Sequence, residues 1–199
     1  MSGTHIVLMG DSIFDNRPYT GGGPAVVDQV GQLLGSEGRA TLVARDGDRV
    51  RDLLSQTTKV PSDATHIVVS VGGNDALDNY TVLMEPTDNV ADTMLRLGEI
   101  VDRFEEEYRR GIQSVVGRGV PVTVCTIYNG NFDDEVERQV VSATVRLFND
   151  AIYRVANDVG LPVIDLRSVC NRPEDYANPI EPSSIGGEKI ARAILATVT

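Results

Sequence analysis

Residues 5–12 read HIVLMGDS, an apolar run that ends in a glycine, an acidic residue and a serine. Four further short apolar runs lie at residues 41–44, 66–72, 121–127 and 162–166. Stretches of helical period alternate with these runs, which is typical of a parallel sheet covered by helices on both faces. The sequence therefore predicts a three-layer, doubly wound α/β fold with about five parallel strands.

Two longer stretches, residues 90–115 and 141–159, carry apolar residues at intervals of three or four. Such stripes predict amphipathic helices whose apolar face packs on the core. Pro86 suits the first turn of the earlier helix and Gly117 suits its end. The stripe of this helix comprises Val90, Met94, Leu97, Val101, Phe104, Tyr108, Ile112 and Val115. No repeat or long polar linker interrupts the alternation, so we expect residues 1–199 to form one domain.

Composition narrows the classes of partner. The chain has 18 basic and 29 acidic residues, for a net charge of −11. Nucleic acids and anionic membrane surfaces select for basic patches, so a small-molecule substrate fits better than either. The two cysteines give no disulfide framework, and no charged leader with an apolar run precedes residue 5. We therefore expect a cytoplasmic protein.

Three of the predicted strands are followed by short polar segments that contain glycine: residues 10–16 (GDSIFDN), 45–48 (RDGD) and 72–75 (GGND). In folds of this kind ligands bind at the carboxyl edge of the sheet, where these segments meet. Any one segment alone is better explained as a turn or a helix cap. Together they supply a hydroxyl nucleophile and N–H donors for the oxyanion that forms when a carbonyl is attacked.

These segments resemble the sequence blocks of the SGNH hydrolases, also called GDSL esterases or lipases. Residues 10–12 resemble the first block, with Ser12 in the place of the nucleophile. Gly47 resembles the glycine of the second block, and residues 72–75 resemble the Gly-x-Asn-Asp of the third. The resemblance implies a flavodoxin-like fold and hydrolysis of a small ester without a cofactor. It also implies an oxyanion hole made by the amides of Ser12 and Gly47 and the side chain of Asn74.

Acidic residues at the same edge invite comparison with a metal site. They are Asp11, Asp15, Asp75, Asp78 and Asp175. They lack the spacing of a dedicated ligand set, and the resemblance assigns Asp11 and Asp75 to supporting loops. We therefore expect no metal.

The last block of the family reads Asp-x-x-His-Pro, and its histidine is the general base for the serine. Here residues 175–186 read DYANPIEPSSIG and contain no histidine. Counting back from Gly186 puts Glu181 in the histidine position and Asn178 in the aspartate position, whereas counting from Asp175 puts Asn178 in the histidine position. The chain has two histidines, His5 and His66, both at the starts of predicted strands and roughly 15–20 Å from the carboxyl edge.

We therefore predict that Glu181 accepts the proton of Ser12 and that Asn178 orients Glu181, with Asp175 as the other candidate for the base. An ordinary Glu, with a pKa of about 4.3, is a poor base for a serine near pH 7, so the site needs a raised pKa or an acidic working pH. Glu181 could instead form a salt bridge or cap a helix.

Three functions remain open from the sequence. The first is an esterase that uses Ser12 and Glu181. The second is a binding module that holds an ester or an acetylated ligand without turnover, and the third is a hydrolase that borrows a histidine from a partner or its substrate. Tyr128, in the loop 128–132 after the fourth strand, could line an acyl or leaving-group pocket, although a plain turn explains this loop equally well.

Overall fold

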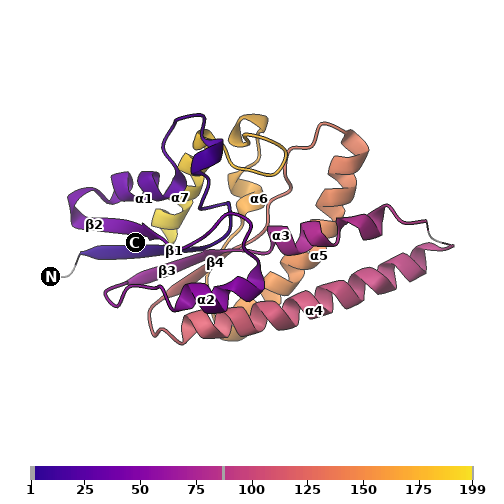
Figure 1. The fold of residues 1–199 in the computed structure, drawn as a ribbon, viewed down its shortest axis with the longest axis horizontal. Helices are drawn as coiled ribbons and strands as arrows, with labels where there is room; N and C mark the ends of the chain where they lie inside the picture. Colours follow the sequence, from indigo (N-terminus) through magenta and orange to yellow (C-terminus); the bar gives the residue numbers. More distant parts are fainter. Residues whose placement is uncertain (1–2, 87, 199) are drawn as a thin grey trace.

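The structure is a computed structural model that describes residues 3–86 and 88–198. Its centre is a sheet of five parallel strands in the order β2-β1-β3-β4-β5 (Figure 1). The strands are β1 (Thr4–Gly10), β2 (Gly38–Leu42), β3 (His66–Ser70), β4 (Val122–Cys125) and β5 (Val163–Ile164). The α/β fold predicted from the alternating apolar runs is thereby confirmed.

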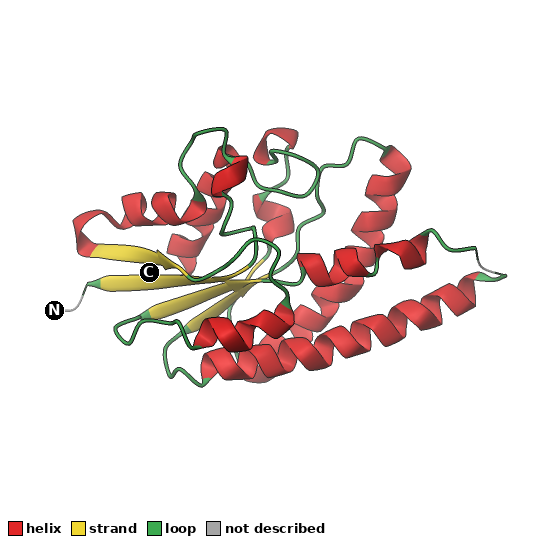
Figure 2. Ribbon diagram, in the orientation of Figure 1, coloured by secondary structure: helices red, strands yellow, loops and turns green. Residues whose placement is uncertain are grey.

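Helices cover both faces of this sheet (Figures 1 and 2). One face is covered by α1 (Val26–Leu34), α6 (Leu166–Val169) and α7 (Ser184–Val198). The other is covered by α2 (Leu53–Thr57), α4 (Val90–Val116) and α5 (Glu135–Val159). The connections contain α3 (Gly73–Asp78) and the 3-10 turns η1 (Arg17–Tyr19), η2 (Gly35–Glu37), η3 (Val50–Asp52), η4 (Tyr80–Leu83) and η5 (Pro173–Asp175). No helix of residues 3–86 or 88–198 has the length and apolar character needed to span a bilayer.

The core is divided by the sheet into two layers, because successive side chains of a strand point to opposite faces. In β1, Ile6 and Leu8 pack in the layer under α1 and α7, whereas Val7 and Met9 pack in the layer under α4 and α5. All four side chains are fully buried. A strand that is apolar at every position is therefore a strand with both faces covered.

The ends of α4 differ from the prediction. The helix begins at Val90 with Asn89 as its cap, so Pro86 precedes the helix and does not lie in its first turn. Val90 and Met94 are 75% and 50% exposed, although the helical stripe predicted that they would be buried. With 27 residues, α4 is about 40 Å long, more than twice the length of a five-residue strand. Its first turns therefore extend past the sheet (Figure 1).

β1 and β3 are neighbours in the sheet, with Gly10 opposite Ser70. After β1 the chain crosses one face through α1, and after β3 it crosses the other face through α4. The connections thus diverge at the carboxyl ends of these two strands and leave a crevice there, which is the usual ligand site of such sheets. The loops that carry Ser12 and Asn74 border this crevice.

Candidate active site

Ser12 is held in a tight turn at the end of β1. Gly10 has a φ of +126°, and a Cβ there would lie 1.8 Å from the carbonyl oxygen of Ser70. Asp11 then donates its backbone N–H to the same oxygen at 3.0 Å. The first block therefore needs glycine because its backbone passes directly against β3, and this contact places Ser12 at the crevice, where it is 7% exposed.

Asp11 supports this turn and does not face solvent. Its Oδ1 accepts the N–H of Ile13 at 3.1 Å. Burial raises the pKa of Asp11 to about 8, even though the bond from Ile13 lowers it, and the nearby carboxyl groups of Glu181 and Asp75 raise it further. Asp11 is therefore largely protonated at neutral pH, which limits the negative charge beside Ser12.

The three expected oxyanion donors lie on adjacent loops. Asn74 donates one Nδ2–H to the carbonyl of Asp48 at 2.9 Å, which ties the loop after β3 to the loop after β2 and leaves its second N–H available. Gly47 has a φ of +84° and its carbonyl accepts from Arg49 at 3.0 Å. Within residues 3–86 and 88–198, no acceptor bonds the backbone amides of Ser12 and Gly47.

Two further side chains, Asp75 and Gln56, hold the loop after β2 against its neighbours. Asp75 accepts the amide of Val50 at 3.2 Å, and burial raises the pKa of this carboxyl to about 6. Gln56 bonds both the amide and the carbonyl of Gly10, at 2.8 and 2.7 Å, and also reaches Asp48 Oδ2 at 2.7 Å. Gln56 thus joins the first two sequence blocks. Because Gln56 lies outside both blocks, the sequence did not reveal this role.

Glu181 lies against Ser12 at the base of the crevice. Its carboxyl group lies close enough to Ser12 for the serine side chain to affect its pKa, and the residue is only 6% exposed. Burial raises the pKa of Glu181 to about 7, the nearby side chain of Ser12 opposes this shift, and the charge of Asp46 adds to it. The second carboxyl oxygen, Oε2, is buried and receives no hydrogen bond from the described part of the chain.

The backbone of the Glu181 loop is held on several sides. Asn178 Oδ1 accepts the amides of Ile180 and Glu181, both at 2.9 Å, so it orients Glu181 through a local turn and not by contact with the carboxyl group. Tyr128 donates to the carbonyl of Ile180 at 2.6 Å. Asn16, fully buried and not singled out from the sequence, donates to the carbonyl of Pro182 at 3.3 Å.

Asp175, the other candidate for the base, is bonded to other groups. It is fully buried, accepts the amides of Asn171 and Arg172 at 3.0 Å, and lies 2.7 Å from the ammonium group of Lys189. Its carbonyl would lie 2.2 Å from a Cβ at Gly186, which explains the glycine at the start of α7. The register counted back from Gly186 is thus the one that brings a carboxylate, that of Glu181, to Ser12.

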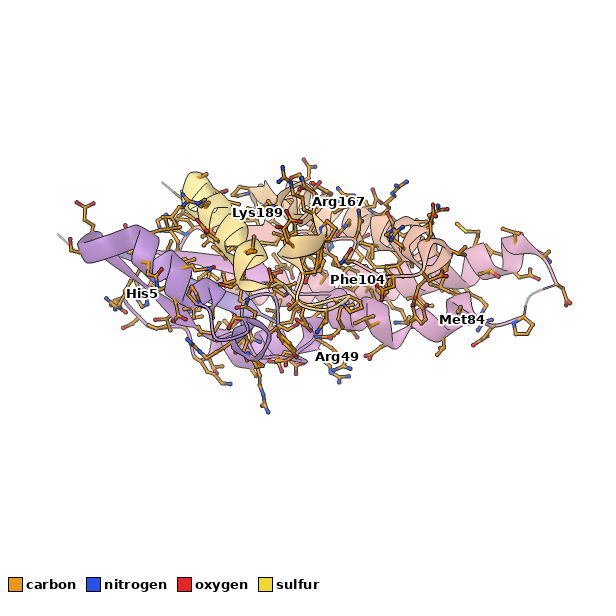
Figure 3. The ribbon with its side chains drawn as sticks, turned by 90° about the horizontal axis from the view of Figure 1, so that it is seen from above. His5, Arg49, Met84, Phe104, Arg167 and Lys189 are labelled. Carbon is orange, nitrogen blue, oxygen red and sulfur yellow. The ribbon has the colours of Figure 1, made fainter. Side chains whose placement is uncertain are left out.

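Both histidines lie at the amino ends of their strands. His5 contacts Asp63 at 3.1 Å and Thr41 at 2.8 Å, and His66 contacts Thr65 at 3.0 Å. Figure 3 shows His5 well apart from Arg49, which follows the carboxyl end of β2. Neither histidine is placed to serve Ser12.

The remaining acids of this edge are each engaged by the protein. Asp15 accepts the amide of Asp46 at 3.0 Å, and Asp78 forms an ion pair with Arg49. In the described part of the chain, no group of three or more His, Cys, Asp or Glu side chains is arranged to hold a metal ion.

A mostly apolar pocket opens beside Ser12 and Glu181. Side chains from α3, η4, α4, α5 and the loop after β4 form its wall. The apolar members include Leu77, Leu83, Leu97, Tyr128, Phe132, Val141, Val145 and Phe148. Val145 and Phe148 belong to a stripe expected only to fill the core, so the helical period located these residues but could not distinguish a core from a pocket wall. The pocket can accept a hydrocarbon group next to the serine hydroxyl.

A family model described as GDSL-like Lipase/Acylhydrolase family matches residues 8–185. The chain belongs to this family. The match includes the first three sequence blocks and Glu181, so the GDSL assignment covers the crevice as well as the sheet. A search of curated proteins found no match.

Solved structures similar to this GDSL-like protein include a phospholipase A1 from Streptomyces albidoflavus, with 15% identity, full coverage of both chains and a TM-score of 0.74. An extracellular lipase from Streptomyces rimosus has 18% identity over 98% of this chain and 100% of its own, with a TM-score of 0.68. A catalytic mutant of an acetylxylan esterase from Geobacillus stearothermophilus, with alanine in place of a histidine, has 19% identity over 98% of this chain and 94% of its own, with a TM-score of 0.71. At these identities the likeness establishes a shared fold.

Proposed function

We propose that the protein is a serine ester hydrolase in which Ser12 is the nucleophile and Glu181 is the general base. The observation that carries this proposal is the close approach of a buried serine hydroxyl to a buried carboxyl group whose pKa is raised to about 7. A base with a pKa near the working pH combines a useful ionised fraction with enough proton affinity to assist a hydroxyl.

The reaction follows from this arrangement in two stages. Glu181 takes the proton of Ser12 as Oγ attacks the carbonyl carbon of the ester, and the oxyanion is received by the amides of Ser12 and Gly47 and the free N–H of Asn74. Protonated Glu181 then gives its proton to the leaving alcohol, which leaves an acyl group on Ser12. Glu181 next takes a proton from water, which attacks the acyl group, and the acid is released as the serine recovers its proton.

The apolar pocket indicates the acyl side of the substrate. A buried methylene is stabilised by about 0.8 kcal/mol, so an acyl chain of several carbons gains from this pocket and an acetyl group gains little. We therefore propose esters of medium-chain acids as the preferred substrates. Cys125 and Cys170 are both free and buried, in keeping with the cytoplasmic location that we propose.

The test combines turnover with covalent labelling. Wild-type protein is incubated with p-nitrophenyl acetate, butyrate and octanoate, and separately with a fluorophosphonate probe, beside Ser12→Ala and the exposed control Ser36→Ala. We expect turnover that rises with chain length and a single adduct on Ser12. Ser12→Ala should lose at least about a thousandfold in kcat and all labelling, while Ser36→Ala retains both.

The opposite outcome would favour the non-catalytic alternative. Suppose that wild-type protein binds p-nitrophenyl octanoate but gives no turnover and no adduct at any pH from 4 to 9. The protein would then be a binding module that keeps the fold and the pocket. Turnover that persists in Ser12→Ala would reject the proposed nucleophile.

A further inference from the structure

A second groove lies between α5 and the segment that follows α6. Its lining contains four arginines, Arg138, Arg146, Arg167 and Arg172, and no aspartate or glutamate. The chain as a whole has 29 acidic residues and only 18 basic ones. A groove whose lining carries four guanidinium groups and no carboxylate therefore differs in charge from the acidic protein around it.

Three of these arginines are not tightly paired. Arg146 has no hydrogen bond or ion pair with any described residue, and the contact of Arg172 with Glu174 is 3.8 Å long. Arg138 donates to the carbonyl of Phe132 at 2.9 Å and forms no ion pair within the described ranges. Arg167, by contrast, is held by Asp165 at 2.7 Å. The groove thus retains donors for an anion after its internal bonds are made.

The groove meets the active-site pocket at the loop after β4. Asn129 and Gly130 line both spaces. The loop is fixed to the Glu181 segment because Asn131 donates to the carbonyl of Pro179 at 2.8 Å. Gly130 has a φ of +75°, and a Cβ there would lie 2.7 Å from the same carbonyl, so this close approach requires glycine.

The wall between the two spaces is aromatic. Tyr176, which lines the groove, packs edge to face on Tyr128 with ring centroids 5.0 Å apart, and Tyr128 braces the carbonyl next to Glu181. Asn129 also has a buried side-chain oxygen that receives no bond from the described chain. A substrate that reaches from Ser12 over this loop would find the arginines of the groove beyond it.

We propose that the groove binds an anionic group, a phosphate or a carboxylate, carried on the alcohol part of the ester whose acyl chain lies in the apolar pocket. This inference rests on the proposed function, because it assumes that Ser12 attacks the ester and that the acyl chain lies in the apolar pocket. Arginine suits the task because its planar donors match phosphate and carboxylate oxygens in pairs. Hydrolysis breaks the acyl–oxygen bond, and the anionic group leaves unchanged on the released alcohol.

The test compares two substrates that differ only in the phosphate group, 1-decanoylglycerol and 1-decanoylglycerol 3-phosphate, both below their aggregation concentrations. We expect wild-type kcat/KM to favour the phosphate ester by about tenfold or more, and the preference to weaken with added salt because the groove is open to solvent. The double variant Arg146→Ala/Arg172→Ala should lower this ratio to near one. The double variant Arg39→Ala/Arg192→Ala, which removes the same net charge from ion-paired surface sites, should leave the ratio unchanged.

Binding to Ser12→Ala separates this inference from the proposed function. Calorimetry should detect 1-decanoylglycerol 3-phosphate bound to Ser12→Ala, with affinity at least about tenfold weaker once Arg146 and Arg172 are also replaced. That result with no turnover by wild-type protein would support the groove and reject the esterase. Turnover with equal kcat/KM for both esters would overturn the groove and leave the esterase standing.

Free phosphate is tested in parallel with the same proteins. Inorganic phosphate should compete weakly with the phosphate ester, because it lacks the acyl chain. Inorganic phosphate that binds as tightly as the phosphate ester, and inhibits both substrates equally, would contradict a role in holding the substrate.

Discussion

Glu181 and Asp175 are two buried carboxyl groups, six residues apart at the same edge of the sheet, and their surroundings are opposite. Asp175 lies 2.7 Å from Lys189 and accepts two backbone amides. Glu181 has no cationic partner among the described residues, and its pKa is raised to about 7 because burial disfavours its charge. Because the ammonium group of Lys189 lies beside Asp175 and not beside Glu181, Asp175 stabilises the fold whereas Glu181 can exchange a proton.

The largest expected effect on stability falls on the paired acid. Asp175→Asn removes the charge opposite Lys189 without changing the shape of the side chain, and we expect it to lower the free energy of unfolding by about 3 kcal/mol. The control Asp150→Asn removes an exposed pair with Arg154 and should cost less than about 0.5 kcal/mol. Urea denaturation measures both variants, and equal losses would remove the contrast between the two acids.

Ionisation of Glu181, the unpaired acid, should lower the stability of the folded protein, whereas the charge of Asp175 stabilises it. The pKa of Glu181 is about 7 in the folded protein and 4.5 ordinarily. Between pH 4.5 and about pH 7 the folded state therefore keeps a proton that the unfolded state has lost. The stability that Glu181 contributes is present below about pH 4.5 and is lost as the pH rises through about 7. Glu181→Gln should therefore match wild type near pH 4 and exceed it by about 2 kcal/mol near pH 8.

Denaturation of wild type and Glu181→Gln across this range measures the difference directly. Asp11, whose raised pKa acts in the same direction, is present in both proteins and largely cancels. A difference that stays constant with pH would show that Glu181 does not titrate in the folded protein over this range.

The smallest effect is expected from Asp46, an exposed neighbour whose charge raises the pKa of Glu181. Asp46→Asn should move the acidic limb of the pH–rate profile to lower pH, because the ionised form of Glu181 becomes easier to form. The matched change Asp133→Asn, in the loop before α5, removes one charge elsewhere and should leave the limb in place. A limb that moves to higher pH would contradict the assigned electrostatics.

The sequence predicted the sheet because strands covered on both faces are apolar throughout, and it predicted the meeting of three loops because parallel strands end at one edge. It missed the exposure of Val90 and Met94, since helical period does not reveal where the sheet beneath a helix ends. The bond from the backbone N–H of Glu181 to Asn178 depends on turn geometry, and the pocket wall is formed by several separate elements. Neither feature leaves a periodic pattern in the chain.

The central claim is that Glu181 is the base for Ser12, and the most direct measurement is the pH dependence of the p-nitrophenol burst from p-nitrophenyl octanoate. For wild-type protein the burst rate constant should rise with pH and level off above an apparent pKa of about 7. Glu181→Gln should fold normally, react about a thousandfold more slowly at pH 8 and show no titration near 7. A Glu181→Gln variant with the wild-type rate and the same titration would contradict the account.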